Sequence, residues 1–327
     1  MKRLLFVDDE PNLLAGLRRM LRSERKEWEM DFVEGGEEAL ARLDQKQTDV
    51  VISDMRMPRM NGAEFLNQVQ QRQPATARIC LSGFSDGALI LRGLGSIHQY
   101  LNKPCESGHL IATLRHILQA AARLPAELHE RLCALTCLPV ARATLQKLKT
   151  VLALEEPCLH EVGRLASLDL GMSCRLLQLV HSGFFGTPRH VESVEDACRL
   201  LGVAKLKKLV DLPDGFSTQE VDQEWLAGLG RGADRVSRAN FRLAQERGLS
   251  QRECDYSRLA GTLQGLPELA CTACGWPAVV NEAGLFLIRL WGLPEGVYDA
   301  SHRPEVGFDL PGIASIQTQS IANRASA

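Results

Sequence analysis

The sequence has few aromatic residues, no surplus of basic charge and no long apolar run. Aromatic residues make up 5% of the chain, which leaves little material for stacking the bases of a single-stranded nucleic acid. Lys and Arg total 38 against 40 Asp and Glu, and a net charge of −2 is not typical of proteins that bind nucleic-acid phosphates. No apolar run approaches the roughly 20 residues that span a bilayer. Neither a nucleic acid nor a membrane is therefore expected as a partner.

The chain also lacks a disulfide framework and a secretion signal. Its 10 cysteines are scattered, and the pair Cys271 and Cys274 has no second pair at a spacing suited to zinc, so we interpret all of them as ordinary thiols. The apolar residues 4–7 look like the start of a signal peptide, but the run is too short and acidic residues follow it at once. We expect a cytoplasmic protein with reduced thiols.

The length of 327 residues predicts about two domains, since a domain averages roughly 150 residues. Up to about residue 122, short apolar runs alternate with helical patterns such as 12–21 and 63–70. The runs lie at 4–7, 49–52 and 77–81, with weaker candidates at 29–33 and 98–101. Near-continuous apolar strands are typical of a parallel sheet that is buried on both faces. The first half is therefore predicted to be a doubly wound α/β domain with a five-stranded parallel sheet.

Polar residues follow the predicted strands at the points where the strands end. They are Asp8 and Asp9 after the first strand, Asp54 after the third, Ser82 after the fourth and Lys103 after the fifth. The carboxyl ends of parallel strands meet at one edge of a doubly wound sheet, where ligands bind. Carboxylates held a few ångströms apart repel each other and need a cation, and oxygen ligands suit Mg²⁺. We therefore predict a magnesium site at this edge.

Four motifs surround these strand ends. They are F-V-D-D-E at 6–10, D-M-R-M-P-R-M-N-G at 54–62, S-G at 82–83 and Y-L-N-K-P at 100–104. With them, residues 1–122 resemble the receiver domain of bacterial response regulators. The resemblance implies a flavodoxin-like fold, phosphorylation by a sensor histidine kinase and a bound Mg²⁺.

The resemblance also implies a role for each residue of the metal site. Asp54 accepts the phosphoryl group. Asp9 binds Mg²⁺ directly and Asp8 binds it through water, while Asp54 and the backbone carbonyl of Arg56 complete the protein ligands. Phosphoryl transfer depends on positioning and on neutralising the charge of the transferred oxygens, which is chemistry that these groups can perform.

Three further residues would respond to the phosphoryl group. In the family pattern Lys103 pairs with its oxygens, Ser82 donates a hydrogen bond to one of them, and Tyr100 turns inward as an aromatic switch. A half-exposed aromatic on an edge strand is the alternative reading of Tyr100. Pro104 is expected to follow a cis peptide bond. The helix predicted at 107–123 would carry the signal onward, and its apolar stripe is interpreted as core in preference to a dimer face.

From about residue 126 the strand pattern stops and apolar residues recur with a helical period, as at 140–154 and 160–168. The distinctive stretch is R-L-L-Q-L-V-H-S-G-F-F-G at 175–186, followed by V-E-D-A at 194–197 and L-L-G at 200–202. This half resembles the HDOD domain, a helical output module related to HD phosphohydrolases. We predict a helical linker at 123–137, an all-α HDOD domain at 138–306 and a flexible tail at 307–327.

The HD hydrolases bind metal through a His-Asp pair, and the matching stretch of this chain, L-A-G-T-L-Q-G-L at 259–266, has Gln264 and Gly265 in its place. A glycine has no side chain to donate, and a neutral amide oxygen is a poor substitute for imidazole. We therefore predict that this half is not an enzyme, and that the receiver catalyses only its own phosphorylation and dephosphorylation.

The resulting hypothesis is a two-component response regulator. Phosphorylation of Asp54 would control a non-catalytic signalling module that contacts an unidentified downstream signalling protein or forms a homodimer. One alternative is a phosphorylation-gated HD-type phosphohydrolase acting on cyclic di-nucleotides or nucleotides. A DNA-binding regulator is a second alternative, although the chain has no recognisable helix-turn-helix.

Overall fold

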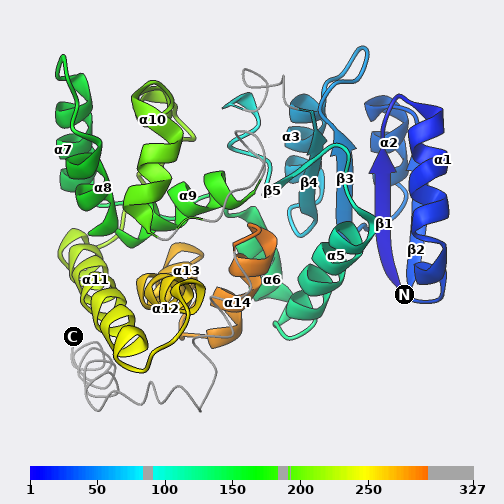
Figure 1. Ribbon diagram of the computed structural model, residues 1–327. Helices are drawn as coiled ribbons and strands as arrows, with labels where there is room; N and C mark the ends of the chain where they lie inside the picture. Colours follow the sequence, from blue (N-terminus) through cyan, green and yellow to red (C-terminus); the bar gives the residue numbers. More distant parts are fainter. Residues whose placement is uncertain (84–90, 183–190, 192, 294–327) are drawn as a thin grey trace.

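The structure is a computed structural model that describes residues 1–83, 91–182, 191 and 193–293 (Figure 1). The tail predicted to be flexible, 307–327, lies outside the described residues. So do residues 183–186, which close the distinctive stretch of the second half.

A single five-stranded sheet forms the first half, with all four neighbouring pairs of strands parallel. Its strand order is β2-β1-β3-β4-β5, the flavodoxin-like order. The strands are β1 (Lys2–Val7), β2 (Trp28–Val33), β3 (Val50–Asp54), β4 (Ala77–Ser82) and β5 (Gln99–Asn102). The predicted doubly wound fold is therefore confirmed, including the two weaker strand candidates.

Burial on both faces explains why the strands are apolar without alternation. Every residue of β3 is buried, because helices cover both faces of the sheet. The helices are amphipathic and turn their apolar sides inward, as Leu14 and Leu17 do on the first of them. They are α1 (Pro11–Met20), α2 (Gly36–Leu43), α3 (Gly62–Arg72) and α5 (Ser107–Ala121), with the short helix η1 (Arg22–Lys26) after α1.

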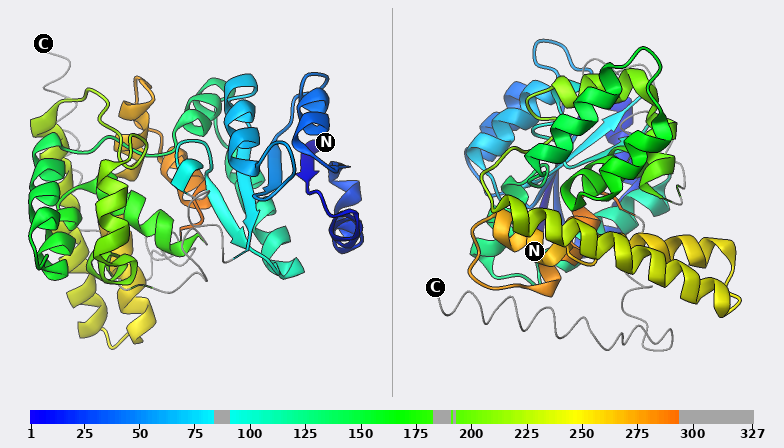
Figure 2. Two further views of the ribbon diagram at one scale, coloured as in Figure 1. Left: turned by 90° about the horizontal axis from the view of Figure 1, so that it is seen from above. Right: turned by 90° about the vertical axis from the view of Figure 1, so that its left-hand side faces the viewer.

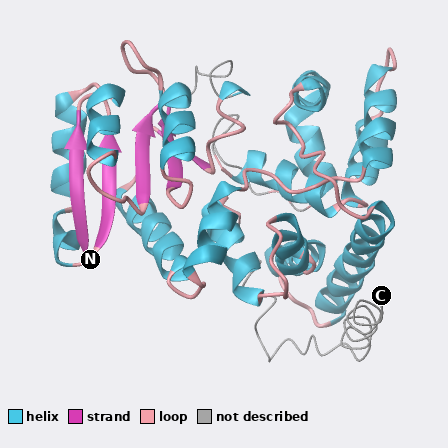
Figure 3. Cartoon of the chain, turned by 180° about the vertical axis from the view of Figure 1, so that it is seen from behind, coloured by secondary structure: helices cyan, strands magenta, loops and turns pink. Residues whose placement is uncertain are grey.

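The second half is helical in the part of the chain that the structure describes, as predicted. Figure 3 shows all strands in one part of the molecule and helices in the other. The helices are α6 (Ala126–Ala134), α7 (Arg142–Ala153), α8 (Leu159–Ser167), α9 (Leu170–His181), α10 (Val194–Asp211), α11 (Gln223–Glu246), α12 (Gln251–Leu263), α13 (Leu266–Ala273) and α14 (Asn281–Leu290).

The sheet presents its β5 edge to the helical half and its β2 edge to the opposite end of the molecule, as two views show (Figures 1 and 2). Helix α5, the last helix of the first half, packs against α14 of the second half. The predicted apolar stripe of α5 is part of the core: Leu110, Leu114 and Ile117 are buried. The helix predicted to carry the signal therefore contacts both halves.

Two expectations about the whole chain can be compared with the described residues. None of the helices in the described ranges is long and apolar enough to cross a membrane. All ten cysteines are free thiols, which agrees with the expectation of reduced cysteines.

Candidate functional site

The residues predicted to form the site lie at one edge of the sheet. Asp8 follows β1 directly, Asp54 is the last residue of β3, Ser82 is the last residue of β4, and Lys103 follows β5. All five strands are parallel, so these ends meet at the carboxyl edge of the sheet. The side chain of Ser82 lies outside the part of the chain that the structure describes.

A lysine bridges two buried carboxylates at this edge. Lys103 Nζ donates to Asp8 Oδ2 at 2.8 Å and forms an ion pair with Asp54 Oδ1. Asp8 is 1% exposed and Asp54 is 6% exposed, so both are removed from bulk water. The peptide bond from Lys103 to Pro104 is cis, as expected.

Backbone amides hold the second oxygen of each carboxylate. The amide of Glu10 donates to Asp8 Oδ1 at 3.0 Å, and the amide of Arg56 donates to Asp54 Oδ2 at 2.7 Å. Each acid is therefore fixed by one amide two residues ahead and by one shared ammonium. Charge-assisted bonds of this kind are short and orient both partners.

Local sequence fixes the loop that follows Asp54. Asn61 caps α3, since its side chain accepts from the amide of Glu64 at 3.0 Å, and the Glu64 side chain reaches back to the amide of Asn61. The next residue, Gly62, donates its amide to Met55 O at 2.9 Å. A Cβ at Gly62 would collide with the backbone of Asp54 and Met55. Only glycine lets α3 begin this close to the phosphoacceptor candidate.

The electrostatics of the edge are dominated by burial. Removal from water raises the pKa of Asp54 above its ordinary value, although Lys103 and the amide of Arg56 offset part of that effect. Burial by itself lowers the pKa of Lys103, but the hydrogen bonds to Asp54 and Asp8 outweigh it, and the net pKa is raised. Lys103 stays charged, and one ammonium does not fully compensate the two acids.

The residues of the edge fit a divalent cation. The carboxylates of Asp8 and Asp54 already hold one cationic group between them, the ammonium of Lys103, with Asp9 half-buried beside them. In the described residues as they stand, no three His, Cys, Asp or Glu side chains lie close enough together to hold a metal ion. The oxygen donors of Asp8, Asp9 and Asp54 are of the type that suits Mg²⁺, and these residues would hold the ion.

Tyr100 is fully buried on β5, which rules out the alternative reading of a half-exposed aromatic. Its strand neighbour is Cys80 on β4. A Cβ at Gly93 would lie 2.6 Å from the Tyr100 hydroxyl, so the phenol rests directly against that glycine. Tyr100 also contributes to the electrostatic surroundings of Arg175 in the helical half. The predicted switch residue thus lies between the two halves of the chain.

Sequence analysis missed a buried arginine that joins the halves. Arg175 on α9 is 1% exposed, and within the part of the chain that the structure describes its guanidinium pairs with no carboxylate. Its guanidinium donates to four backbone carbonyls: Leu94 at 3.1 Å, Thr136 at 3.0 Å, Asp214 at 2.9 Å and Gly215 at 3.1 Å. Only the first of these belongs to the sheet half. The one signal in the sequence was that Arg175 opens the distinctive stretch at 175–186.

A second missed cluster lies beside it. Gln178 on α9 donates to His98 O at 2.9 Å, just before β5. The amide of Arg78 donates to Nδ1 of His98 at 3.0 Å, so Nε2 carries the proton and donates to Cys133 O at 2.8 Å. The Arg78 guanidinium donates to the same Cys133 carbonyl at 2.9 Å. Residues that precede Tyr100 in the sequence, His98 among them, are thus tied to the helical half.

The position predicted to lack metal ligands is packed with apolar groups. Gln264 is exposed, and a Cβ at Gly265 would lie 2.8 Å from Leu229 Cδ1 and 3.1 Å from Leu170 Cδ2. The space that an aspartate would need is therefore filled by leucine methyl groups.

Comparison with known proteins matches the two halves to two families. Residues 4–115 match the family model of the response regulator receiver domain, and residues 138–275 match that of the HDOD domain. The hydrogenase transcriptional regulatory protein HoxA of Cupriavidus necator is 38% identical over 119 residues, which cover 36% of this chain and 24% of HoxA. The transcriptional regulatory protein TrcR of Mycobacterium tuberculosis is 31% identical over 123 residues, 37% of this chain and 47% of TrcR.

The chain thus spans less than half the length of these curated relatives. Among solved structures, the signal receiver domain of an HD domain-containing protein from Pseudomonas fluorescens is 31% identical. It has a TM-score of 0.35 and covers 36% of this chain and 94% of its own.

Proposed function

The chain joins a response regulator receiver domain to an HDOD domain, and we propose that it is a two-component response regulator whose Asp54 takes a phosphoryl group from a sensor histidine kinase. The observation that carries this proposal is the bridge of Lys103 between Asp8 and Asp54 at the strand ends. It is a buried acidic edge with a fixed cation, which is the arrangement that phosphoryl transfer to a carboxylate needs.

In the proposed reaction, a carboxylate oxygen of Asp54 attacks the phosphorus of a phosphohistidine. The P–N bond breaks, its electron pair returns to the imidazole, and an acyl phosphate forms on Asp54. A bound Mg²⁺, held by Asp8, Asp9, Asp54 and the backbone carbonyl of Arg56, would neutralise charge on the transferred oxygens. The amide of Arg56 orients the attacking carboxylate, since it already binds Asp54 Oδ2.

Lys103 and Ser82 would then hold the product. The ammonium of Lys103 exchanges its contact with Asp54 for one with a phosphoryl oxygen, and the hydroxyl of Ser82 donates to another. Phosphorylation adds nearly two negative charges to the loop that follows β3. The response at Ser82 would change the packing of Tyr100, which lies beyond it on the neighbouring strand β5.

Transmission to the HDOD domain would pass through the contacts of the segment that leads to Tyr100. Arg175 binds Leu94 O and Gln178 binds His98 O, so both ends of the segment that leads into β5 are attached to α9. A movement of Tyr100 must alter these hydrogen bonds or carry α9 with it. The HDOD domain is proposed to be a non-catalytic module, because Gln264 and Gly265 offer no metal ligands of the HD type. Its downstream partner would be a signalling protein of the cytoplasm.

Labelling with a small phosphodonor tests the proposal. Wild-type protein incubated with acetyl phosphate and Mg²⁺ should gain one phosphoryl group, and Asp54→Asn should gain none. Asp44→Asn is the matched control, because Asp44 is exposed and pairs with Arg72 away from the strand ends. Labelling that persists in Asp54→Asn would contradict the assignment, and stoichiometric transition metal in the purified protein would favour a hydrolase.

A further inference from the structure

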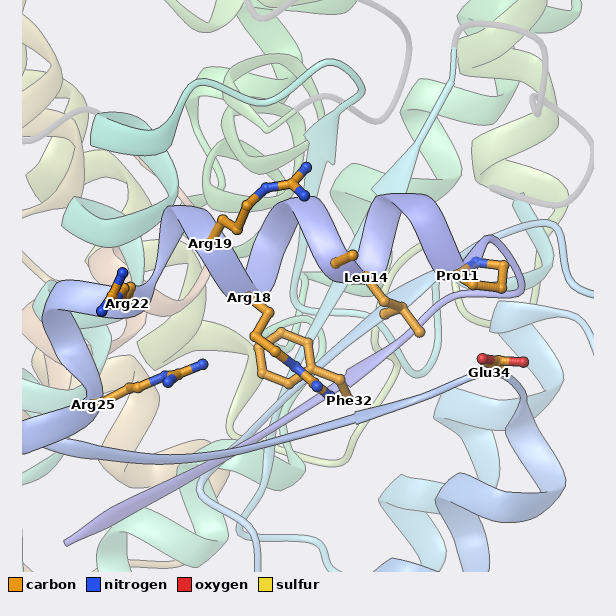
Figure 4. A pocket seen from close by; sticks show the side chains of 9 residues that line it. Pro11, Leu14, Arg18, Arg19, Arg22, Arg25, Phe32 and Glu34 are labelled. Atoms are coloured by element: carbon orange, nitrogen blue, oxygen red, sulfur yellow. The ribbon is translucent and has the colours of Figure 1, made fainter.

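A groove with a basic end runs along α1 on the side of the receiver domain away from the HDOD half. It has a volume of about 520 Å³, lies between α1, η1 and β2, and is lined among others by Arg18, Arg22, Arg25, Phe32 and Glu34 (Figure 4). Cavities of about this size, roughly 300–1,000 Å³, are typical of small-molecule sites. Asp8, Asp54 and Lys103 of the acidic edge do not line the groove, although its end at Glu34 lies at the carboxyl end of β2.

In the described ranges, the arginines that line the groove lack a carboxylate partner, whereas four other arginines of this domain have one. Arg18, Arg19, Arg22 and Arg25 all line the groove, and among the described residues none of them forms an ion pair. By contrast, four other arginines of the domain pair with carboxylates: Arg3 with Glu29, Arg42 with Glu38, Arg72 with Asp44 and Arg115 with Glu24. Four unpaired guanidinium groups in one groove of a chain with a net charge of −2 attract an anion.

An arginine and an aromatic ring form the middle of the groove. The guanidinium of Arg18 lies over the ring of Phe32, 5.0 Å from its centroid. The ring is fixed from below, because it stacks on buried Phe6 with centroids 4.9 Å apart and an angle of 10° between the planes. The buried side chain of Leu14 lies next to it (Figure 4). Such a planar pair of an arginine and an aromatic ring suits the face of another planar ring.

The opposite end of the groove carries a hydrogen-bond acceptor. Figure 4 shows Glu34 beside Pro11 at one end and Arg22 and Arg25 at the other, with Arg18 and Phe32 between them. The groove therefore has three chemically different parts in a line: a cationic end, a flat middle and an acidic end.

We propose that this groove binds a nucleoside polyphosphate. The phosphates bind Arg22 and Arg25, the base lies against the pair of Arg18 and Phe32, and Glu34 accepts a hydrogen bond from an amino group of the base. Inorganic triphosphate matches only the cationic end, and an uncharged nucleoside matches only the other two parts. A ligand with all three features in this order is a nucleotide with a chain of phosphates.

Equilibrium dialysis of the full chain with ATP, adenosine and inorganic triphosphate tests this site, with EDTA present so that no magnesium complex forms at the acidic edge. ATP should bind saturably at one site, and about tenfold more tightly than either fragment. The double variant Arg22→Gln with Arg25→Gln should weaken ATP binding by about tenfold or more. Lys26→Gln is the matched control, since Lys26 is an exposed cation of η1 that does not line the groove, and it should bind ATP as the wild type does.

Each remaining readout separates the proposed site from simpler ones. Glu34→Gln should weaken ATP binding and leave triphosphate binding unchanged. Both substituted arginines are exposed, so circular dichroism and a denaturant melt should match the wild type and report that the double variant is folded. Equal affinity for triphosphate and ATP, ATP binding that survives in the double variant, or no saturable binding would overturn the proposal, the first by reducing the site to an anion patch. The result does not depend on whether Asp54 is the phosphoacceptor.

Discussion

At the scale of single residues, the acidic edge depends on the positive charge of Lys103. Its ammonium is shared by Asp8 and Asp54, both almost without contact to water. Without it, the two carboxylates repel each other across a buried edge, and the developing charge on a transferred phosphoryl group has no fixed counter-charge. The lysine is therefore expected to matter more for the reaction than for holding the fold together.

Substitution of this lysine gives the first prediction. Lys103→Gln should slow the labelling of Asp54 by acetyl phosphate by about 100-fold, the usual effect of removing one group that stabilises a transition-state charge. Lys46→Gln, which removes an exposed lysine paired with Glu29, should label at the wild-type rate. Near-normal labelling of Lys103→Gln would show that the bridge is structural only.

The filled position at Gly265 gives a second prediction. Restoring the HD pair with Gln264→His and Gly265→Asp should lower the free energy of unfolding by about 1–3 kcal/mol, because a carboxylate is pushed against Leu229 and Leu170. Gln264→His alone is the control, since Gln264 is exposed. Denaturant melts of both variants measure the free energy of unfolding, and metal analysis shows whether either variant binds a metal ion. Tight binding of a divalent metal by the double variant would mean that the hydrolase site is still present.

Residues at strand ends could be placed from sequence, and buried arginines could not. Asp8, Asp54 and Lys103 each follow an apolar strand, and parallel strands bring such residues to one edge whatever the rest of the fold does. Arg78 lies inside an apolar run, where an arginine suggests exposure, yet it is fully buried. Its acceptors are backbone carbonyls of distant segments, including Cys133, and no local pattern reveals those.

At the scale of elements, α9 is attached to the segment that leads into β5 by two side chains. Arg175 and Gln178 are one turn apart on the helix and bind the carbonyls of Leu94 and His98. The guanidinium also serves Thr136, Asp214 and Gly215. Arg175 therefore connects α9, Thr136 and the segment 214–215 with Leu94 of the receiver.

Removing that arginine is the third prediction. Arg175→Met leaves four carbonyls without their donor, two of them on the buried residues Leu94 and Gly215, so the free energy of unfolding should fall by about 2–4 kcal/mol. Amide hydrogen exchange in 91–98 and in α9 should quicken. Arg164→Met, at an exposed position of α8, should change neither quantity by more than about 0.5 kcal/mol. Equal stability of the two variants would show that the network does not hold the halves together.

The stability that His98 at this interface contributes should depend on pH. Burial, followed by the neighbouring Arg78 cation, holds the pKa of His98 well below its ordinary value of 6.5. The unfolded chain binds a proton below about pH 6.5 that the folded protein refuses, so stability is present above that pH and is lost as the pH falls. Between about pH 7 and pH 5 the wild type should therefore lose more stability than His98→Gln. Parallel pH profiles of the two proteins would contradict this.

The period of the apolar residues predicted the helices but not which helices pack against each other. The stripe on α5 correctly indicated a buried face, and the period beyond residue 126 correctly indicated helices. Neither pattern could show that α5 packs on α14, about 170 residues further along the chain, because an apolar stripe records burial and not the identity of the covering surface.

At the scale of the whole molecule, the chain places the edge with the phosphoacceptor candidate in one half and a helical domain beside that half. The carboxyl edge of the sheet carries Asp54, and the β5 edge faces the HDOD half (Figure 1). Tyr100 and the carbonyls of Leu94 and His98, which precede it, lie where the two halves meet. On this account, phosphorylation takes place in the receiver half, and it changes the contacts that α9 of the HDOD half makes with the receiver.

Hydrogen–deuterium exchange with and without beryllofluoride, a mimic of the phosphoryl group, tests that coupling most directly. In the wild type with Mg²⁺, beryllofluoride should change the exchange of the loop after Asp54, of residues 91–102 and of α9, across the boundary between the halves. Asp54→Asn should show none of these changes. Changes confined to the loops at the acidic edge, with α9 unaffected, would contradict the claim that the HDOD domain responds to the phosphoacceptor.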